Sequence, residues 1–462
     1  MKSLLRKLVP EFMMNWYHFI LAYLGALIYR FPSRKLIVIG VTGTTGKTTT
    51  CNLIAQILNY CGSKTGMATT VNFCIGGEEW INEYKQTMLG RFKLQKLLRQ
   101  MVEAGCKYAV IETSSEGILQ HRHRAIDYSV AVFTNLSPEH IERHGGFENY
   151  RAAKLELFEK VAKREGGIGV YNLDDENVES FLAIPIKRRY GYCTKCRASG
   201  YRAAMLENKH HIYDIDVSPS KTSFVFDDEK FELPLIGEFN AYNAAAAICV
   251  ALSQGLEIGQ IKKALTLARP VSGRMEIIDE GQDFAAIVDY AHEPASFEGA
   301  LKAIKNFNLK RTIVVFGSAG GGRDKWRRPM MGEIADKYAE IIIVTTDDPG
   351  DEKPGEIIDE ILEGVLSAKG GSAVRLSSPP KSSGGKNRER ILKKNVFKIV
   401  DRRRAIRVAV DLAQSDDLIL FAGKGGETWM NVKNGKKIPW DESAVVREEI
   451  RNKMADIPVI KI

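Results

Sequence analysis

The chain has 462 residues, of which 44% are hydrophobic, so it can bury two ordinary domains, or three if one is small. Its formal net charge of +9 is spread among acidic neighbours, which argues against a nucleic-acid partner and suits anionic small substrates or a membrane surface. Seven scattered cysteines predict a reducing compartment without a disulfide framework. Cys193 and Cys196 form a C-x-x-C pair, but neither a second such pair nor a pair of histidines completes a zinc site, which argues against a metal or redox role.

The first predicted element is an apolar helix over residues 12–29. This stretch carries no formal charge and has basic residues on both sides, namely Lys2, Arg6 and Lys7 before it and Arg30, Arg34 and Lys35 after it. It is at the lower length limit for a membrane span, and no small-residue cleavage site of a signal peptide follows. Three alternatives stay open: a helix packed on the protein's own core, an interfacial membrane helix and a membrane span.

From residue 34 onwards, short apolar runs alternate with helical patterns, which predicts βαβ units around parallel sheets. The predicted strands lie within residues 35–40, 108–115, 129–135, 167–172, 284–292, 312–318, 341–349 and 418–427. Most of them end in polar residues. Because ligands of open α/β sheets bind at the carboxyl ends of the strands, we expect the chemistry there.

Three other segments have a different character. Residues 221–237 alternate around an acidic turn, which predicts an antiparallel hairpin. Residues 269–276 are a plausible hinge between two lobes, and the Gly/Pro/Ser-rich residues 377–390 indicate a surface loop.

The stretch "VTGTTGKTTT" follows the first of these strands and opens a helix. A glycine-rich turn between a strand and a helix surrounds an anion with backbone N–H groups and the positive end of the helix dipole. Lys47 is expected to reach the outer phosphates and Thr48 to complete a Mg²⁺ shell. Gly40 lies one residue too far from Gly46 for the common phosphate-loop spacing, so the loop is predicted to bind a nucleoside triphosphate in a variant manner.

Polar residues that follow the next strands are candidates for the same site. Glu112 ends a buried strand, where a carboxylate needs a cation partner such as Mg²⁺ opposite Thr48. "FTNLSPEHIERHG" offers His140, and the helical segment "YRAAKLELF" offers Lys154. Taken singly, His140 fits an ordinary loop histidine and Lys154 an ordinary surface lysine.

Taken together, the ordered motifs closely resemble the Mur ligases, the ATP-dependent amide-forming enzymes of peptidoglycan assembly, and most of all the UDP-N-acetylmuramyl-tripeptide synthetase branch. The resemblance runs from about Arg34 to Glu427, through the motifs "VTGTTGKTTT", "ETSSEGILQHR", "AVFTNLSPEHIERHG", "YRAAKLELF", "NLDD", "GEFNAYNAAAA", "VSGRMEII", "VDYAHEP", "FGSAGGGRDKWRRPMMG", "TTDDPGDEKP", "DRRRAI" and "AGKGGE". It implies a central α/β ATP-binding domain with a P-loop and a parallel sheet at 34–272, and a C-terminal Rossmann-like domain at 273–462 that closes over it. The predicted apolar N-terminal helix occupies residues 1–33 before these two domains.

The resemblance also implies roles for single residues. The catalytic set is Lys47, Glu112, His140 and Lys154. Two Mg²⁺ sites are expected on Thr48, Glu112, His140 and Lys154, the last as a carbamylated lysine. ATP contacts are expected from Gly43, Thr44, Thr45, Gly46, Lys47, Thr48, Thr49, Asn240, Asn243, Arg274, Asp289 and Arg323. Substrate contacts are expected from Thr87, Ser114, Gln120, Arg122, His292, Asp348, Gly423 and Glu427.

The implied reaction passes the γ-phosphoryl group of ATP to a carboxylate, and an amine then attacks the acyl phosphate. The expected partners are small molecules, a nucleotide-sugar peptide and an amino acid, with no nucleic acid. We expect a cytoplasmic monomer, with peripheral membrane contact through residues 12–29 on the cytoplasmic side as an open alternative.

Three departures from the family pattern bear on the substrates. The uridine-nucleotide-binding domain that usually precedes the P-loop is replaced by the apolar helix. The usual threonine pair reads Gln86 and Thr87, and the "DNPR" signature of meso-diaminopimelate enzymes reads "DDPG", ending at Gly350. Gly350 therefore predicts a preference for a basic amino acid such as L-lysine.

The alternatives that stay open are a ligase for a lipid-linked or pseudomurein-type acceptor, a folylpolyglutamate-like enzyme, against which "ETSS" and "QHR" argue, and a membrane-associated P-loop ATPase without ligase activity.

Overall fold

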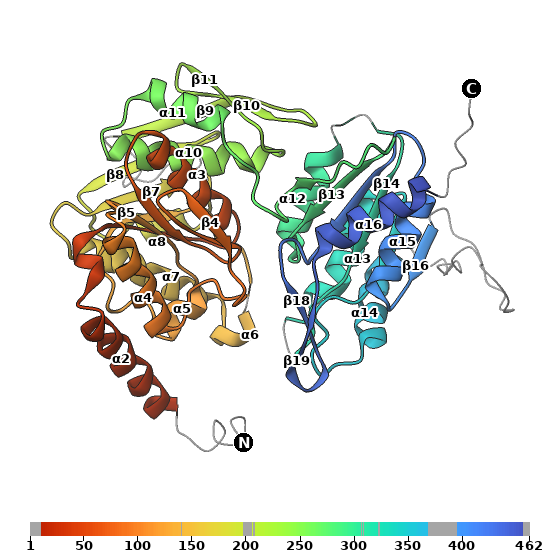
Figure 1. Cartoon of the computed structure of the whole chain (residues 1–462), viewed down its shortest axis with the longest axis horizontal. Helices are drawn as coiled ribbons and strands as arrows, with labels where there is room; N and C mark the ends of the chain where they lie inside the picture. Colours follow the sequence, from red (N-terminus) through yellow and green to blue (C-terminus); the bar gives the residue numbers. More distant parts are fainter. Residues whose placement is uncertain are drawn as a thin grey trace, which may run out of the picture. The chain divides into compact units, whose positions relative to one another are not determined.

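The computed structural model describes residues 11–139, 141–196, 206, 208–305, 307, 309–321, 324–367 and 395–455. The chain forms two compact units, Met1–Arg269 and Pro270–Ile462, and the boundary between them along the chain falls within the predicted hinge segment, residues 269–276 (Figure 1). The predicted surface loop at 377–390 lies outside the described residues.

An eleven-stranded sheet organises the first unit, in the order β11-β10-β9-β8-β7-β6-β1-β5-β2-β3-β4. Its strands are β1 (Ile37–Thr42), β2 (Thr65–Ala68), β3 (Asn72–Ile75), β4 (Glu78–Ile81), β5 (Tyr108–Glu112), β6 (Tyr128–Phe133), β7 (Ile168–Asn172), β8 (Arg188–Cys193), β9 (Asn208–Val217), β10 (Thr222–Phe226) and β11 (Glu229–Leu233). The strands from β9 to β2 in this order pair in parallel. The predicted hairpin is β10–β11.

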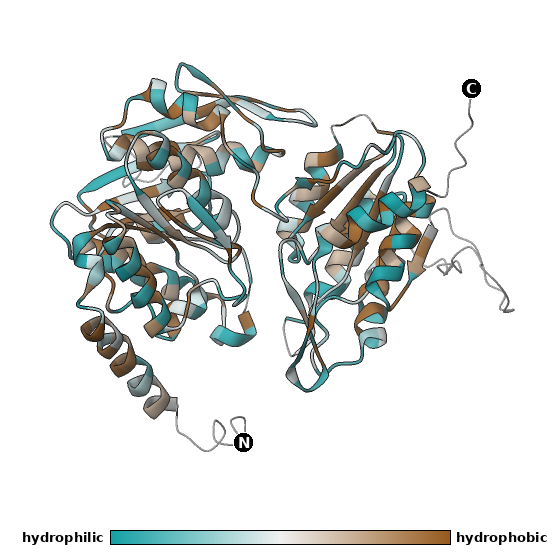
Figure 2. Ribbon diagram, viewed as in Figure 1, coloured by the Kyte–Doolittle hydropathy of each residue, from teal (hydrophilic) through white to brown (hydrophobic). Residues whose placement is uncertain are grey.

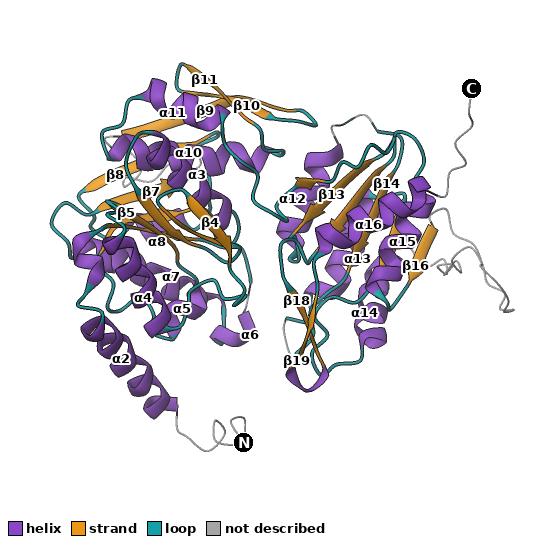
Figure 3. Cartoon of the chain, in the orientation of Figure 1, coloured by secondary structure: helices purple, strands orange, loops and turns teal. Residues whose placement is uncertain are grey.

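Helices cover both faces of this sheet (Figure 3). They are α3 (Lys47–Tyr60), α4 (Arg91–Glu103), α5 (Ser115–Leu119), α6 (Ile141–His144), α7 (Phe147–Ala162), α8 (Val178–Leu182), α10 (Glu238–Ser253) and α11 (Ile258–Thr266). Alternate residues of β1 enter two different cores, since Val41 packs with α3 and α10 while Val38 packs with α4 and α7. Helix α3 buries its predicted apolar face, and Gly62 follows its end with φ of 81°.

The predicted apolar helix is α2 (Glu11–Ile28), which a short 3₁₀ turn, Pro32–Lys35, connects to β1. Among the residues of α2 whose burial is described, the buried ones form a narrow stripe of small residues, Ala22, Gly25 and Ala26, and this stripe packs on α4. Much of the helix is hydrophobic (Figure 2), and several of its large apolar residues are exposed, namely Met13, Trp16, Tyr17, Phe19, Ile20, Tyr23, Leu24, Leu27 and Ile28. No helix among the described residues is long and apolar enough to span a bilayer.

The second unit contains a six-stranded sheet in the order β12-β13-β17-β14-β15-β16. Its strands are β12 (Glu276–Ile277), β13 (Ala285–Asp289), β14 (Thr312–Phe316), β15 (Ile341–Val344), β16 (Asn395–Lys398) and β17 (Leu418–Ala422), and all but β12 run parallel. Its helices are α12 (Pro294–Lys305), α13 (Arg327–Tyr338), α14 (Pro354–Ser367), α15 (Arg402–Leu412) and α16 (Glu442–Ala455). A separate hairpin joins β18 (Trp429–Val432) to β19 (Lys436–Pro439) around a 3₁₀ turn, Lys433–Gly435. The predicted α/β class, with a parallel central sheet and a second Rossmann-like sheet, is confirmed.

One pair of cysteines is bonded. A disulfide joins Cys193, the last residue of β8, to Cys196, whereas the sequence argued against a redox role for this pair and against a disulfide framework. Cys51, Cys61, Cys74, Cys106 and Cys249 are free. The bond closes a tight turn between neighbours, so it is not the long-range framework that secreted small domains use.

Candidate active site

The turn between β1 and α3 leaves no room for side chains at two positions. Gly46 has φ of 79°, and a Cβ there would lie 2.3 Å from Asn243 Oδ1. A Cβ on Gly43 would lie 1.9 Å from Thr134 Oγ1. Both glycines are therefore required for the backbone to pass this close to its neighbours.

The threonines of this turn are held by a neighbouring strand end and by α7. Thr45 donates from its backbone N and from Oγ1 to Asn135 Oδ1, at 2.9 and 3.1 Å. The hydroxyls of Thr44 and Tyr150 are 3.0 Å apart, and Lys47 Nζ donates to the Thr44 carbonyl at 2.7 Å. Asn135 and Tyr150 were not predicted as site residues, although Asn135 ends a predicted strand and Tyr150 begins the motif "YRAAKLELF".

Thr48 and Glu112 come together as predicted. Glu112 ends β5 and is 2% exposed, and its Oε2 accepts from Thr48 Oγ1 at 2.9 Å. The same oxygen accepts from the backbone N and the hydroxyl of Thr70, at 2.8 and 3.0 Å. Thr70 Oγ1 in turn lies 3.0 Å from Thr87 Oγ1, which brings one predicted substrate residue to this group. Thr70 itself was not predicted.

These oxygens fit Mg²⁺. A buried carboxylate beside a threonine hydroxyl supplies the hard oxygen ligands that this ion prefers, and a cation would offset the cost of burying the charge. His140, the predicted ligand of a second Mg²⁺, lies outside the described residues, as does Arg323. Thr49 lies partly exposed in the first turn of α3.

Lys154 extends from α7 to the same turn and is 2% exposed. Its Nζ donates to the Gly43 carbonyl at 2.6 Å and lies 4.4 Å from the centre of the Tyr150 ring. Burial, reinforced by the nearby Lys47 ammonium, holds the pKa of Lys154 well below its usual range, although Glu139 and Glu112 act in the opposite direction. Burial therefore disfavours the charged ammonium form at this position.

Two predicted adenine contacts lie on α10. Asn243 Nδ2 donates to Asn240 Oδ1 at 3.0 Å, and Asn240 Nδ2 donates to the Ile236 carbonyl at 2.9 Å. Thr50 Oγ1 donates to Asn243 Oδ1 at 3.3 Å, so α10 is tied to the start of α3. This pairing fixes both amides next to the glycine turn.

Three predicted acceptor contacts share the segment around α5. Ser114 caps this helix by accepting from Gly117 N at 3.2 Å. Arg122 donates to Gln120 Oε1 at 2.7 Å and also to the Met88 carbonyl. The segment follows β5, so it begins directly after Glu112.

In the second unit, Asp289 ends β13 and organises a tight turn. It accepts from the backbone N–H groups of Met275 and Ala291, at 2.7 and 2.8 Å. Burial raises the pKa of Asp289, against the opposing effect of Arg274. The Arg274 guanidinium lies 4.1 Å from the centre of the Tyr290 ring, and His292 Nδ1 lies 2.8 Å from the Tyr290 carbonyl.

Three predicted residues of the second unit surround a lysine that was not predicted. Lys424 is fully buried, and its Nζ donates to Asp348 Oδ1 at 2.8 Å and to Glu427 Oε2 at 2.5 Å, with Asp347 Oδ1 at 3.6 Å. Burial alone would lower the pKa of Lys424, but the three carboxylates outweigh it and raise the pKa. Gly423 precedes this lysine, and a Cβ there would lie 2.8 Å from Asp347 Oδ2. Lys424 belongs to the motif "AGKGGE", and this motif is the sequence signal that could have identified it as a site residue.

Known proteins resemble the chain over nearly its whole length. Residues 41–251 match the Mur ligase middle domain, and residues 273–425 match the Mur ligase glutamate ligase domain. UDP-N-acetylmuramoyl-L-alanyl-D-glutamate–2,6-diaminopimelate ligase of Syntrophomonas wolfei is 38% identical over 437 residues, which cover 94% of this chain and 82% of the relative. UDP-N-acetylmuramyl-tripeptide synthetase of Roseiflexus sp. is 36% identical over 442 residues, covering 93% and 81%.

A solved structure is similar to the chain as well. A UDP-N-acetylmuramoyl-L-alanyl-D-glutamate–2,6-diaminopimelate ligase superposes with a TM-score of 0.58 at 28% identity, covering 91% of this chain and 79% of that one.

Proposed function

The chain belongs to the Mur ligase family, and on that premise we propose that it joins an amino acid to a UDP-N-acetylmuramoyl-dipeptide acceptor in peptidoglycan synthesis, with ATP as the energy source. The observation that carries the proposal is the cluster of Thr48, Glu112 and Lys154 around one glycine turn. A nucleotide switch or scaffold would need the turn but would not need a buried lysine and a buried carboxylate beside it.

The reaction transfers the γ-phosphoryl group of ATP to the acceptor carboxylate. The amine of the amino acid then attacks the acyl phosphate, and the products are an amide, ADP and inorganic phosphate. The backbone N–H groups of the turn and Lys47 hold phosphate oxygens and stabilise the charge that develops there. Mg²⁺, held by Thr48 and Glu112, supplies further positive charge when bound.

Lys154 is proposed to act as a carbamate. Its neutral amine can attack CO₂, which forms N–COO⁻ and releases one proton. The modification replaces an amine, which in its protonated form would repel Mg²⁺, with an anionic oxygen ligand. Lys154→Ala should therefore lower turnover about a hundredfold or more while leaving the far-UV circular dichroism unchanged, and bicarbonate should raise the activity of the native protein. Near-native turnover of this variant would refute the role.

The amine is proposed to be a diamino acid, because the relatives are named for 2,6-diaminopimelate. Asp348 and Glu427 would position it, together with Lys424. Gly350 offers no side-chain cation for a second carboxylate, so the preference for L-lysine over meso-diaminopimelate stays a prediction, of roughly a hundredfold in kcat/KM. Competition between the two amines on the purified protein decides it, and a clear preference for meso-diaminopimelate would contradict the role of position 350.

Phosphate release tests the ligase proposal. The purified protein, ATP and Mg²⁺ are combined with the acceptor, with the amino acid, or with both. Release that requires both substrates, and a product whose mass equals their sum less one water, supports the ligase. Release that is independent of both would identify an ATPase. A parallel series with a lipid-linked muramoyl peptide distinguishes the two acceptor classes.

A second proposal concerns α2, which would lie on an anionic membrane surface. Trp16, Ile20 and Leu27 are 64, 54 and 61% exposed, and Arg30 and Arg34 follow the helix. A helix that exposes apolar side chains beside basic residues binds the headgroup region of anionic lipids. We propose a monomer at the cytoplasmic face of a membrane, where ATP is available.

Vesicle flotation tests this contact. The protein should float with vesicles of phosphatidylglycerol and phosphatidylcholine, and the triple variant Trp16→Ser, Ile20→Ser, Leu27→Ser should stay at the bottom of the gradient. Leu267→Ser, which replaces a side chain that is 63% exposed elsewhere in the unit, should float normally. Equal flotation of the native protein and the triple variant would refute the proposal. Sedimentation of the lipid-free protein measures its mass and so tests whether it is a monomer.

A further inference from the structure

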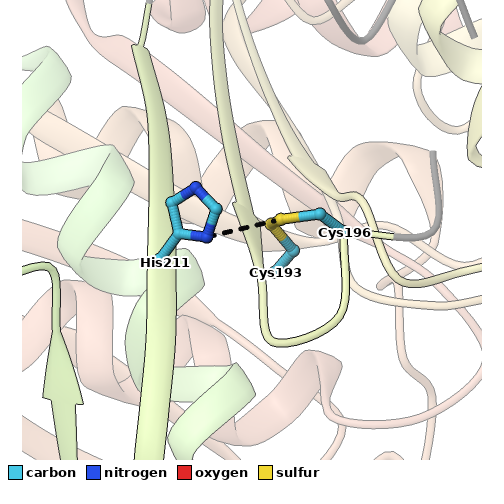
Figure 4. A group of neighbouring side chains, drawn as sticks. All are labelled: Cys193, Cys196 and His211. Carbon is cyan, nitrogen blue, oxygen red and sulfur yellow. Dashed lines mark hydrogen bonds between the residues drawn. A yellow bond between two sulfur atoms is a disulfide. The ribbon is translucent and has the colours of Figure 1, made fainter. Parts of the chain in front are cut away.

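Strand pairing brings a histidine to the C-x-x-C turn. Strands β8 and β9 are parallel neighbours, and Cys193 is the register partner of His211, so both side chains leave the same face of the sheet. Cys196 Sγ lies 3.5 Å from His211 Nδ1 (Figure 4). The two sulfurs and one imidazole nitrogen all lie within 4.8 Å of one another. From this cluster we infer that Cys193, Cys196 and His211 bind a thiophilic divalent cation, of which Zn²⁺ is the representative, when the two cysteines are reduced.

The donor set selects the metal class. Two thiolates and an imidazole suit Zn²⁺ and other soft or borderline ions, whereas the oxygen ligands around Glu112 suit Mg²⁺. Cys193 is buried, Cys196 is half-buried and His211 is exposed, so one side of the cluster opens to solvent. Water can therefore occupy the fourth position of a tetrahedral ion.

The turn that carries the cysteines is fixed by an aspartate outside the cluster. Asp174 accepts from Thr194 N at 2.6 Å, from Thr194 Oγ1 at 2.8 Å and from Lys195 N at 3.0 Å. The Thr194 hydroxyl also lies 2.7 Å from that of Tyr242, on α10. Anchors of this kind hold metal ligands in place before the ion arrives. The sequence argued against a zinc site because neither a second C-x-x-C pair nor a pair of histidines was recognised, and His211 joins the cysteines only through the β8–β9 pairing.

Binding requires reduction of the Cys193–Cys196 bond. A dithiol reductant passes two electrons to the bond and becomes a disulfide itself, leaving two protein thiols. Coordination of one Zn²⁺ then releases both thiol protons.

Cobalt titration of the full-length protein tests the site. The protein is reduced and transferred to buffer with excess Mg²⁺, which saturates oxygen-ligand sites, and Co²⁺ is added. One equivalent of Co²⁺ should produce a sulfur-to-cobalt charge-transfer absorption, and Zn²⁺ should abolish it. We expect each of three variants to weaken Zn²⁺ binding by at least about tenfold: Cys193→Ser, Cys196→Ser and His211→Gln. Loss of an outer-shell partner already costs about that much, and loss of a direct ligand costs more.

Cys61→Ser, which changes a partly exposed cysteine outside the cluster, is the matched control and should leave the titration unchanged. Circular dichroism checks that each variant is folded, and Cys196→Ser replaces Cys193→Ser if the buried position does not tolerate serine. The inference is overturned if the reduced native protein shows no charge-transfer absorption, or if His211→Gln binds Zn²⁺ as tightly as the native protein.

Discussion

At the scale of single residues, Glu112 shows how one buried carboxylate organises the site. Its Oε2 accepts three hydrogen bonds from Thr48 and Thr70, all of them neutral donors. Neutral donors stabilise the charge but do not cancel it, which leaves the position suited to a cation.

Glu112→Gln should abolish most of the activity. The amide keeps the shape of the side chain but removes the charge that would hold Mg²⁺, so we expect turnover to fall about a hundredfold and the apparent Mg²⁺ affinity to fall with it. Phosphate release measured over a Mg²⁺ series checks this. Glu103→Gln, on the exposed face of α4, is the control and should behave as the native protein.

In the second unit, the buried charge with the same organising role as Glu112 is the ammonium of Lys424. Lys424→Met leaves Asp347, Asp348 and Glu427 without their buried cation, and breaking such a group costs about 3–5 kcal/mol. We expect a lower melting temperature whose deficit shrinks on acidification, because protonation removes the carboxylate charges that Lys424 no longer offsets. Thermal unfolding between pH 5 and 8 measures it, and a native-like melting curve would contradict it. Lys436→Met, at an exposed position of β19, should be neutral.

At the scale of elements, α2 packs through its small residues. Gly25 is buried in the last turn of this helix, and a Cβ there would make ordinary contacts of 3.6 Å with Arg91 and Phe92 of α4. Gly25→Ala should therefore stabilise the docked helix by about 0.5–1 kcal/mol, because alanine loses less backbone entropy and meets no clash. Hydrogen exchange of α2 amides measures the gain. Faster exchange in the variant would show that the contact with α4 is tighter than described.

In the turn between β1 and α3, replacing glycine by alanine should be unfavourable, in contrast to Gly25→Ala. Gly46→Ala combines an unfavourable positive φ with an overlap against Asn243, which α10 holds in place. We expect ATP affinity to fall at least tenfold, measured by calorimetry. Gly62→Ala is the matched control, because its φ of 81° is similar but a Cβ there meets nothing within 4 Å. It should lower stability by about 1–2 kcal/mol and leave ATP affinity unchanged.

At the scale of the whole molecule, each unit has its own hydrophobic core. Ile54 belongs to a core of the first unit and Ile406 to the core of the second, and both are fully buried. Ile54→Ala and Ile406→Ala should each lower the free energy of unfolding by about 2–5 kcal/mol. The loss should be confined to the unit that carries the change. Hydrogen exchange resolved along the chain checks this. Loss of protection in both units from either single change would contradict separate cores.

The sequence by itself determined the α/β class, the places of the predicted strands along the chain and the glycine turn between β1 and α3. These follow from local signals, since buried parallel strands are continuous apolar runs and a phosphate loop is a contiguous motif. The motif order also carried the family resemblance, which the relatives confirm. Roles that depend on bound ligands, such as the adenine contacts of Asn240 and Asn243, stay predictions.

Only the tertiary structure decided which distant residues complete these groups. Asn135, Thr70 and Tyr150 reach the glycine turn and its neighbours from other strand ends and from α7, and no spacing along the chain encodes those approaches. His211 lies beside Cys193 because of the strand register. Lys424 lies among carboxylates from two different loops, Asp348 and Glu427. The physical reason is that parallel strands align residues far apart in the chain, so the partner of a buried charge or thiol is set by sheet order rather than by sequence distance.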